Sequence, residues 1–107
     1  MAEPSSPDAR ASVILDELVA TIAARARELP EGSYTTKLLR EGVDRIGRKI
    51  GEEAAEVMTA ALGGEGDARV VSEVADLWFH TMVLLSARGI PLRRVLAELA
   101  ARHAKGK

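Results

Sequence analysis

Hydrophobic residues recur every three or four positions along most of this chain, the spacing that gathers them on one face of an α-helix. The pattern predicts four helices, over residues 13–29, 43–62, 67–88 and 92–104, with Ser12 as the N-cap of the first. Glycine and proline residues separate these segments, at Pro30, Gly32, Gly42, Gly63, Gly64, Gly89 and Pro91. Residues 33–41 remain open as a short helix or an irregular loop.

Strand-like alternation of apolar and polar residues is not found in the sequence, which predicts an all-α fold. Because the loops are short, the helices are expected to be antiparallel neighbours in a bundle of four to five helices. The Pro- and Ser-rich residues 1–11 are predicted to be a disordered tail, residues 12–104 a single domain, and residues 105–107 a frayed end.

The third predicted helix is apolar around nearly its whole circumference between Val70 and Leu85. Such a helix is typical of a buried position, and one small chain has little else to cover it with. We therefore expect a two-fold homodimer that uses apolar faces of the second and third predicted helices. The alternative is that the first and last helices of the same chain wrap around it.

Two helices carry acidic residues at helical spacing. Glu52, Glu53 and Glu56 lie within five positions of the second helix, and Glu73 and Asp76 are three positions apart on the third. Side by side, these helices would direct several carboxylates to one place, where they repel one another unless a cation binds, and Mg²⁺ prefers such oxygen ligands. Solvated surface acids are the alternative, but acids within an apolar helix favour the metal site.

Basic and hydroxyl residues precede and flank the first acidic group, at Lys37, Arg40, Arg45, Arg48 and Lys49, and at Ser33, Thr35 and Thr36. Lys49 and Glu53, like Arg48 and Glu52, are four positions apart, so intrahelical ion pairs explain them as well as phosphate binding does. The hydroxyls fit a helix cap or a ligand contact equally. His80, four positions after Asp76, is predicted to be a hydrogen-bonded core histidine rather than a ligand.

Charge and composition exclude several classes. The formal net charge of −1 gives no basic field for nucleic acid, and the absence of Cys excludes disulfides and thiolate metal sites. Asp76, His80 and Arg88 interrupt the longest apolar run, so no membrane span is predicted, and the N-terminus lacks the pattern of a signal peptide. A cytoplasmic protein without nucleic-acid or membrane partners is expected.

Carboxylates for a metal with cations nearby suit the hydrolysis of phosphate compounds by water, with a spare carboxylate taking the proton. The sequence has no GxxxxGK[ST] loop, which excludes a P-loop enzyme. A di-iron bundle expects Glu-x-x-His on two helices, whereas here His80 follows Glu73 by seven positions and Asp76 by four.

The acidic pattern resembles the EExxE…ExxD signature of the all-α nucleoside triphosphate pyrophosphohydrolases, the MazG-like superfamily. One branch is more similar, the phosphoribosyl-ATP pyrophosphatase family. The segments that carry this resemblance are Gly32-Ser33-Tyr34-Thr35-Thr36-Lys37-Leu38-Leu39, Arg48-Lys49-Ile50-Gly51-Glu52-Glu53-Ala54-Ala55-Glu56 and Ala75-Asp76-Leu77-Trp78-Phe79-His80. The resemblance as a whole covers about Val13 to His103, nearly the whole predicted domain.

The resemblance implies a dimeric α-helical enzyme that hydrolyses phosphoribosyl-ATP to phosphoribosyl-AMP and pyrophosphate with Mg²⁺, the second step of histidine biosynthesis. Metal-binding and catalytic acids would be Glu53, Glu56, Glu73 and Asp76, with Glu52 as the first acid of the signature. Phosphate contacts would come from Lys37, Lys49 and Arg48, a role that we infer. In many organisms this domain is fused to a cyclohydrolase for the next step, and this chain has no Cys/His metal set of that kind.

Two other functions compete with this prediction. A housecleaning pyrophosphatase would use the same acids on noncanonical or excess nucleoside triphosphates. A non-catalytic helical dimerisation module would carry the acids only as structural residues, and would neither bind Mg²⁺ nor release pyrophosphate.

Overall fold

A computed structural model describes residues 13–106 of the chain, and within that range it contains five α-helices and no strand. The helices are α2 (Ile14–Glu28), α3 (Tyr34–Glu41), α4 (Val43–Leu62), α5 (Asp67–Ala87) and α6 (Leu92–Ala104). The all-α prediction is confirmed, and the four predicted helices agree with the observed bounds to within one residue. The predicted tail 1–11, the predicted cap Ser12 and Lys107 lie outside the described residues.

The segment left open between helix and loop is the helix α3. It begins after Ser33, whose Oγ accepts a hydrogen bond of 3.2 Å from the backbone N–H of Thr36, so the hydroxyl of Ser33 is a helix cap. It ends at Gly42, where a φ of 92° lets the backbone turn directly into α4.

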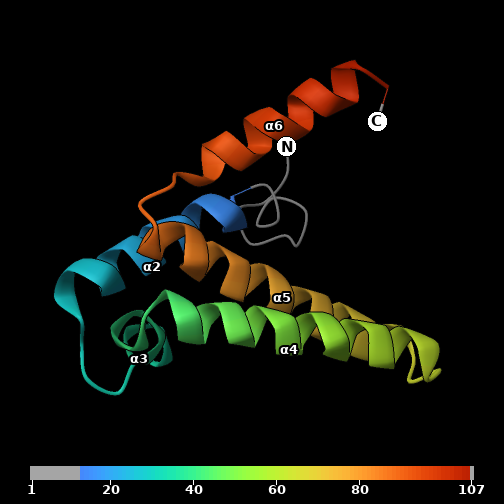
Figure 1. The fold of residues 1–107 in the computed structure, drawn as a ribbon, viewed down its shortest axis with the longest axis horizontal. Helices are drawn as coiled ribbons and strands as arrows, with labels where there is room; N and C mark the ends of the chain where they lie inside the picture. The colour runs from blue at the N-terminus through green and yellow to red at the C-terminus, as the bar shows by residue number, and fades with distance from the viewer. Residues whose placement is uncertain (1–12, 107) are drawn as a thin grey trace, which may run out of the picture.

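The long helices α4 and α5 run antiparallel, side by side, and share the most extensive contact of the fold (Figure 1). The shorter α3 packs against the first half of α4, and α2 contacts both α3 and α5. One residue or more from each of these four helices forms the buried core, which consists of Ile22, Leu38, Ile46, Met82 and Val83. The core lies at the α3 end of the α4–α5 pair and leaves the other end of that pair without a third layer.

The apolar surface of α5 is only partly covered by its own chain. Val71 is 67% exposed and Trp78 is 58% exposed, so the expectation of a buried helix does not hold within one chain. Figure 1 shows α6 running away from α4, and none of its described side chains is buried. The alternative in which the first and last helices wrap α5 is therefore wrong, because α6 stands off from it. A cavity of about 420 Å³ with apolar lining lies between α5, α6 and the start of α2.

The same helix, α5, also bears on the expectation that the chain has no membrane span. By length and composition alone, α5 would suffice to cross a membrane, with a mean hydropathy of 1.3 over its best window, although its polar residues were expected to prevent this. A single such helix is weak evidence, because core helices of soluble proteins have the same composition.

Candidate metal and phosphate site

Three of the predicted acids meet where α4 and α5 lie side by side. Carboxylate oxygens of Glu53, Glu73 and Asp76 all lie within 4.8 Å of one another. Glu53 is 8% exposed and Glu73 is 4% exposed, whereas Asp76 is open to solvent. Buried carboxylates this close together repel one another, and positive charge nearby offsets that repulsion. We call these three residues the acid trio.

Lys49 supplies part of that charge from one turn earlier on α4. Its Nζ lies 3.2 Å from Oε1 of Glu53, so the intrahelical ion pair, one of the two alternatives for this residue, is formed. The hydrogen bond to Glu53 raises the pKa of Lys49, against the smaller opposite effect of desolvation. The ammonium therefore stays charged beside the acid trio at neutral pH.

Arg69 supplies the rest, and sequence reasoning missed it. Its guanidinium nitrogens lie 3.1 Å from Glu73, 3.7 Å from Glu56 and 3.5 Å from Glu65. The pair with Glu56 links α5 to α4. The pairs with Glu65 and Glu73 each join Arg69 to a residue four positions away in the sequence. A signal was present, because Arg69 stands four positions before Glu73, the spacing of an intrahelical ion pair.

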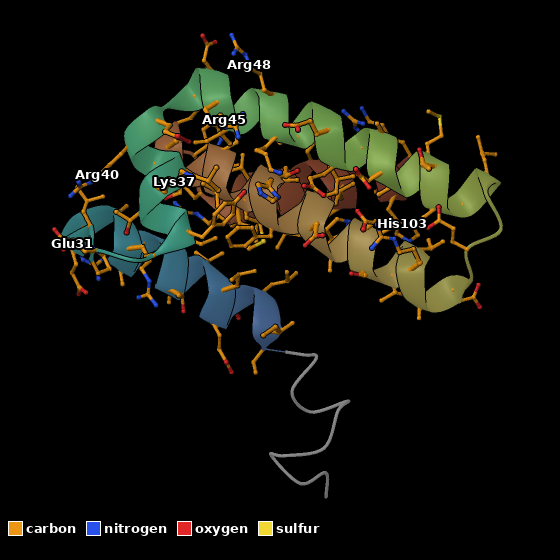
Figure 2. The ribbon with its side chains drawn as sticks, turned by 90° about the horizontal axis from the view of Figure 1, so that it is seen from below. Glu31, Lys37, Arg40, Arg45, Arg48 and His103 are labelled. Carbon is orange, nitrogen blue, oxygen red and sulfur yellow. The ribbon has the colours of Figure 1, made fainter. Side chains whose placement is uncertain are left out.

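The remaining predicted residues lie around this centre rather than in it. Glu56 is exposed and reaches the acid trio only through Arg69. Glu52 and Arg48 are exposed on another side of α4, and their expected ion pair is not formed in the described structure. Figure 2 shows Arg48 projecting outward from α4, away from the rest of the fold.

His80 connects the acid-bearing helix to α3. Its Nδ1 lies 2.7 Å from the backbone oxygen of Asp76, and its Nε2 lies 2.8 Å from the hydroxyl of Tyr34. The rings of Tyr34 and Phe79 pack against the imidazole. The prediction of a hydrogen-bonded core histidine is confirmed, although the partner on Asp76 is the backbone oxygen rather than the carboxylate. The bond to Tyr34 joins the start of α3 to α5, one helical turn beyond Asp76.

The donor set fits a hard divalent cation. The acid trio offers only carboxylate oxygens, which Mg²⁺ binds in preference to nitrogen or sulfur. Two of the three residues are fixed by burial and by their cationic neighbours, so their carboxylates are held close together before any cation binds. The arrangement suits Mg²⁺ better than a metal that requires imidazole or thiolate.

An all-α fold with a carboxylate site for a hard cation, flanked by lysine and arginine, defines a candidate metal-dependent hydrolase of phosphate compounds. The family model of phosphoribosyl-ATP pyrophosphohydrolase matches residues 15–103. The chain belongs to this family, as the three sequence segments predicted.

Several named proteins that are similar in sequence to this chain carry names consistent with this family. A phosphoribosyl-ATP pyrophosphatase of Metallosphaera sedula is 53% identical over 89 residues, which cover 83% of this chain and 95% of the relative. One from Pelobacter propionicus is 49% identical over 89 residues, covering 83% of this chain and 82% of the relative. The histidine biosynthesis bifunctional protein HisIE of Bacillus subtilis is 48% identical over 92 residues, covering 86% of this chain but 44% of that protein.

Proposed function

We propose that this protein is a phosphoribosyl-ATP pyrophosphatase, which hydrolyses phosphoribosyl-ATP to phosphoribosyl-AMP and pyrophosphate in the second step of histidine biosynthesis. The observation that carries the proposal is the acid trio, which unites both acidic segments of the family signature at one point between α4 and α5.

Glu53, Glu73 and Asp76 would hold the Mg²⁺ ion, with Glu56 and Glu52 as the next acids available to it. When bound, the ion supplies positive charge that offsets the charge of the triphosphate and lowers the pKa of a coordinated water. The fit of the donor set supports Mg²⁺ as the cofactor.

The chain's own residues bind the substrate and move the proton. Lys49, which pairs with Glu53, would bind a triphosphate oxygen, and Lys37 and Arg48 would make the further phosphate contacts. A carboxylate outside the acid trio, Glu56 or Glu52, would accept the proton of the attacking water. The water then attacks one phosphorus of the triphosphate, the bond to the bridging oxygen breaks, and pyrophosphate leaves.

We propose that two copies of the chain form a homodimer, in which each copy covers exposed apolar surface of the other. The exposed apolar residues Val71 and Trp78 of α5, Met58 of α4 and the open apolar cavity between α5 and α6 support this proposal. Isolated apolar side chains on a surface are ordinary, but an open apolar cavity that includes the exposed Trp78 is typical of an interface. We further propose that the protein is cytoplasmic and binds neither nucleic acid nor membranes.

The proposal is tested by incubating purified protein with phosphoribosyl-ATP and Mg²⁺ and measuring pyrophosphate and orthophosphate separately. Pyrophosphate is expected first, and only when Mg²⁺ is present. Orthophosphate as the first product would show that the assigned bond is wrong. A panel of common and noncanonical nucleoside triphosphates separates the housecleaning activity, which would process them at least as fast. Failure to release pyrophosphate from any of them would indicate the non-catalytic module.

A further inference from the structure

A second cavity lies away from the acid trio, where the turn after α2 meets one side of α3. It has a volume of about 310 Å³, at the lower end of the range for small-molecule sites, about 300–1,000 Å³. We call it the α2–α3 pocket, and its lining comprises Pro30, Glu31, Gly32, Ser33, Thr36, Lys37, Arg40 and Glu41.

Thr36 is the most informative residue of this lining. It is only 5% exposed, and its Oγ1 is inaccessible to solvent and has no hydrogen-bond partner in the described part of the chain. A buried hydroxyl without a partner destabilises the fold, so such groups are rare unless a ligand or water satisfies them. Ser33, the other hydroxyl of the lining, is already used as the helix cap.

The charged residues of the pocket indicate what kind of ligand it suits. The side chains of Lys37 and Arg40 form no ion pair or hydrogen bond with any other described residue. Figure 2 shows Arg40 on the side of α3 toward Glu31 of the preceding turn, and these two residues and Lys37 line the α2–α3 pocket. Of the two acids, Glu41 is paired with Arg45 at 3.6 Å, and Glu31 is left to accept hydrogen bonds. Two unpaired cations, a buried hydroxyl and a carboxylate at the edge together suit a phosphorylated sugar.

The position of the pocket connects it to the reaction. Tyr34, at the start of α3, is hydrogen-bonded to His80, which lies one turn beyond Asp76 of the acid trio. Lys37 follows Tyr34 by one turn of α3. One helix therefore leads from the metal and triphosphate site to the α2–α3 pocket. Phosphoribosyl-ATP has a matching form, with a triphosphate on one ribose and a single 5′-phosphate on the other.

We propose that the α2–α3 pocket binds the 5′-phosphate of the phosphoribosyl group through Thr36, Lys37 and Arg40, and so distinguishes this substrate from ordinary ATP. The proposal rests on the proposed function, because it places the second phosphate of the same substrate. It makes these residues determinants of specificity, remote from the phosphorus under attack.

The test compares phosphoribosyl-ATP with ribosyl-ATP, the same molecule without the 5′-phosphate. Hydrolysis of both is measured for the parent and for Arg40→Ala, Thr36→Val and the control Arg93→Ala, which removes the same charge from exposed α6. The parent is expected to prefer the phosphorylated substrate by a factor on the order of 100 in kcat/KM, the combined effect of several charge-assisted hydrogen bonds. Arg93→Ala should keep that preference.

Arg40→Ala should lower kcat/KM for phosphoribosyl-ATP roughly tenfold, mainly by raising KM, and should affect ribosyl-ATP much less. Thr36→Val should also reduce the preference while leaving the melting temperature equal or higher, because the methyl group needs no partner. That combination separates a ligand contact from a structural role and keeps the test valid if Arg40→Ala folds poorly.

Equal losses on both substrates in these variants, or a parent that hydrolyses both equally well, would overturn the proposal for the α2–α3 pocket. Both of those results would leave the pyrophosphatase function standing. A parent that hydrolyses neither substrate would instead overturn the proposed function, and this proposal with it.

Discussion

At the scale of single residues, the site is built from acids whose repulsion the chain itself counteracts. Glu53 and Glu73 are buried, and Lys49 and Arg69 each place a cation within 3.2 Å of one of them. Asp76 is the exposed member of the acid trio and has no ion-pair partner within the described structure. Each residue therefore makes a different contribution to stability and to metal binding.

Asp76→Asn removes one charge at nearly constant shape. We expect it to abolish most activity and to leave the metal-free protein as stable as the parent or more stable, because it relieves repulsion within the acid trio. Mg²⁺ should raise the melting temperature of the parent and raise that of the variant much less, since ligands stabilise only the state that binds them. Thermal unfolding in EDTA and in millimolar Mg²⁺ measures both effects. A variant that melts several degrees lower in EDTA, with an undiminished Mg²⁺ shift, would make Asp76 a structural residue.

Arg69→Ala should have the opposite effect. It leaves the buried carboxylate of Glu73 without its cation, so we expect the free energy of unfolding in EDTA to fall by about 1 kcal/mol, limited by the partial exposure of Arg69. Saturating Mg²⁺ should offset much of that loss. Urea denaturation measures it, and Arg102→Ala, which breaks an exposed pair with Glu98, serves as the control with an expected change within ~0.5 kcal/mol. Equal effects of the two substitutions would mean that Arg69 does not support the acid trio.

At the scale of elements, α3 is held to the α4–α5 pair by a few specific contacts. Leu38 is buried in the core, and Tyr34 reaches His80 of α5. Because α3 carries Lys37 and the α2–α3 pocket, the attachment of this helix fixes the distance between the two proposed phosphate sites.

Tyr34→Phe tests that attachment, because it removes the hydrogen bond to His80 but keeps the ring. We expect the free energy of unfolding to fall by ~0.5–1.5 kcal/mol, the usual contribution of one hydrogen bond. Thr81→Val is a matched control, since it removes an exposed hydroxyl bonded to Leu77 on the same helix, with an expected change within ~0.5 kcal/mol. If Tyr34→Phe unfolds at the same urea concentration as the parent, the bond does not hold α3 in place.

The helices themselves were predictable because glycine and proline mark their ends and because helical periodicity is a local property of the sequence. The acid trio was predictable for the same reason, since Glu53, Glu73 and Asp76 fall on facing sides of two neighbouring helices. The Tyr34–His80 bond and the link from Arg69 to Glu56 depend on how closely two helices approach. That distance is set by side-chain packing across the whole fold, which no local pattern contains.

At the scale of the whole molecule, the chain leaves apolar surface on α5 and a helix, α6, without any buried side chain among those described. A second copy that covers this surface accounts for both features. We expect light scattering at micromolar concentration to give twice the mass of one chain.

Trp78→Asp should convert that dimer into a folded monomer, because a carboxylate cannot be buried there without a partner. Light scattering gives the mass, and circular dichroism at 222 nm reports whether the helices persist. A parent with the mass of one chain would contradict the dimer, and a variant that stays dimeric would place the interface elsewhere.

The position of Trp78 has a spectroscopic consequence as well. It is the single tryptophan of the chain and it stands 58% exposed on the surface that a second copy would cover. Its fluorescence therefore originates from one known place, and the emission maximum moves to shorter wavelength when an indole leaves water. Dilution of the unlabelled protein should shift that emission to longer wavelength, and the midpoint of the shift gives the dissociation constant of the dimer.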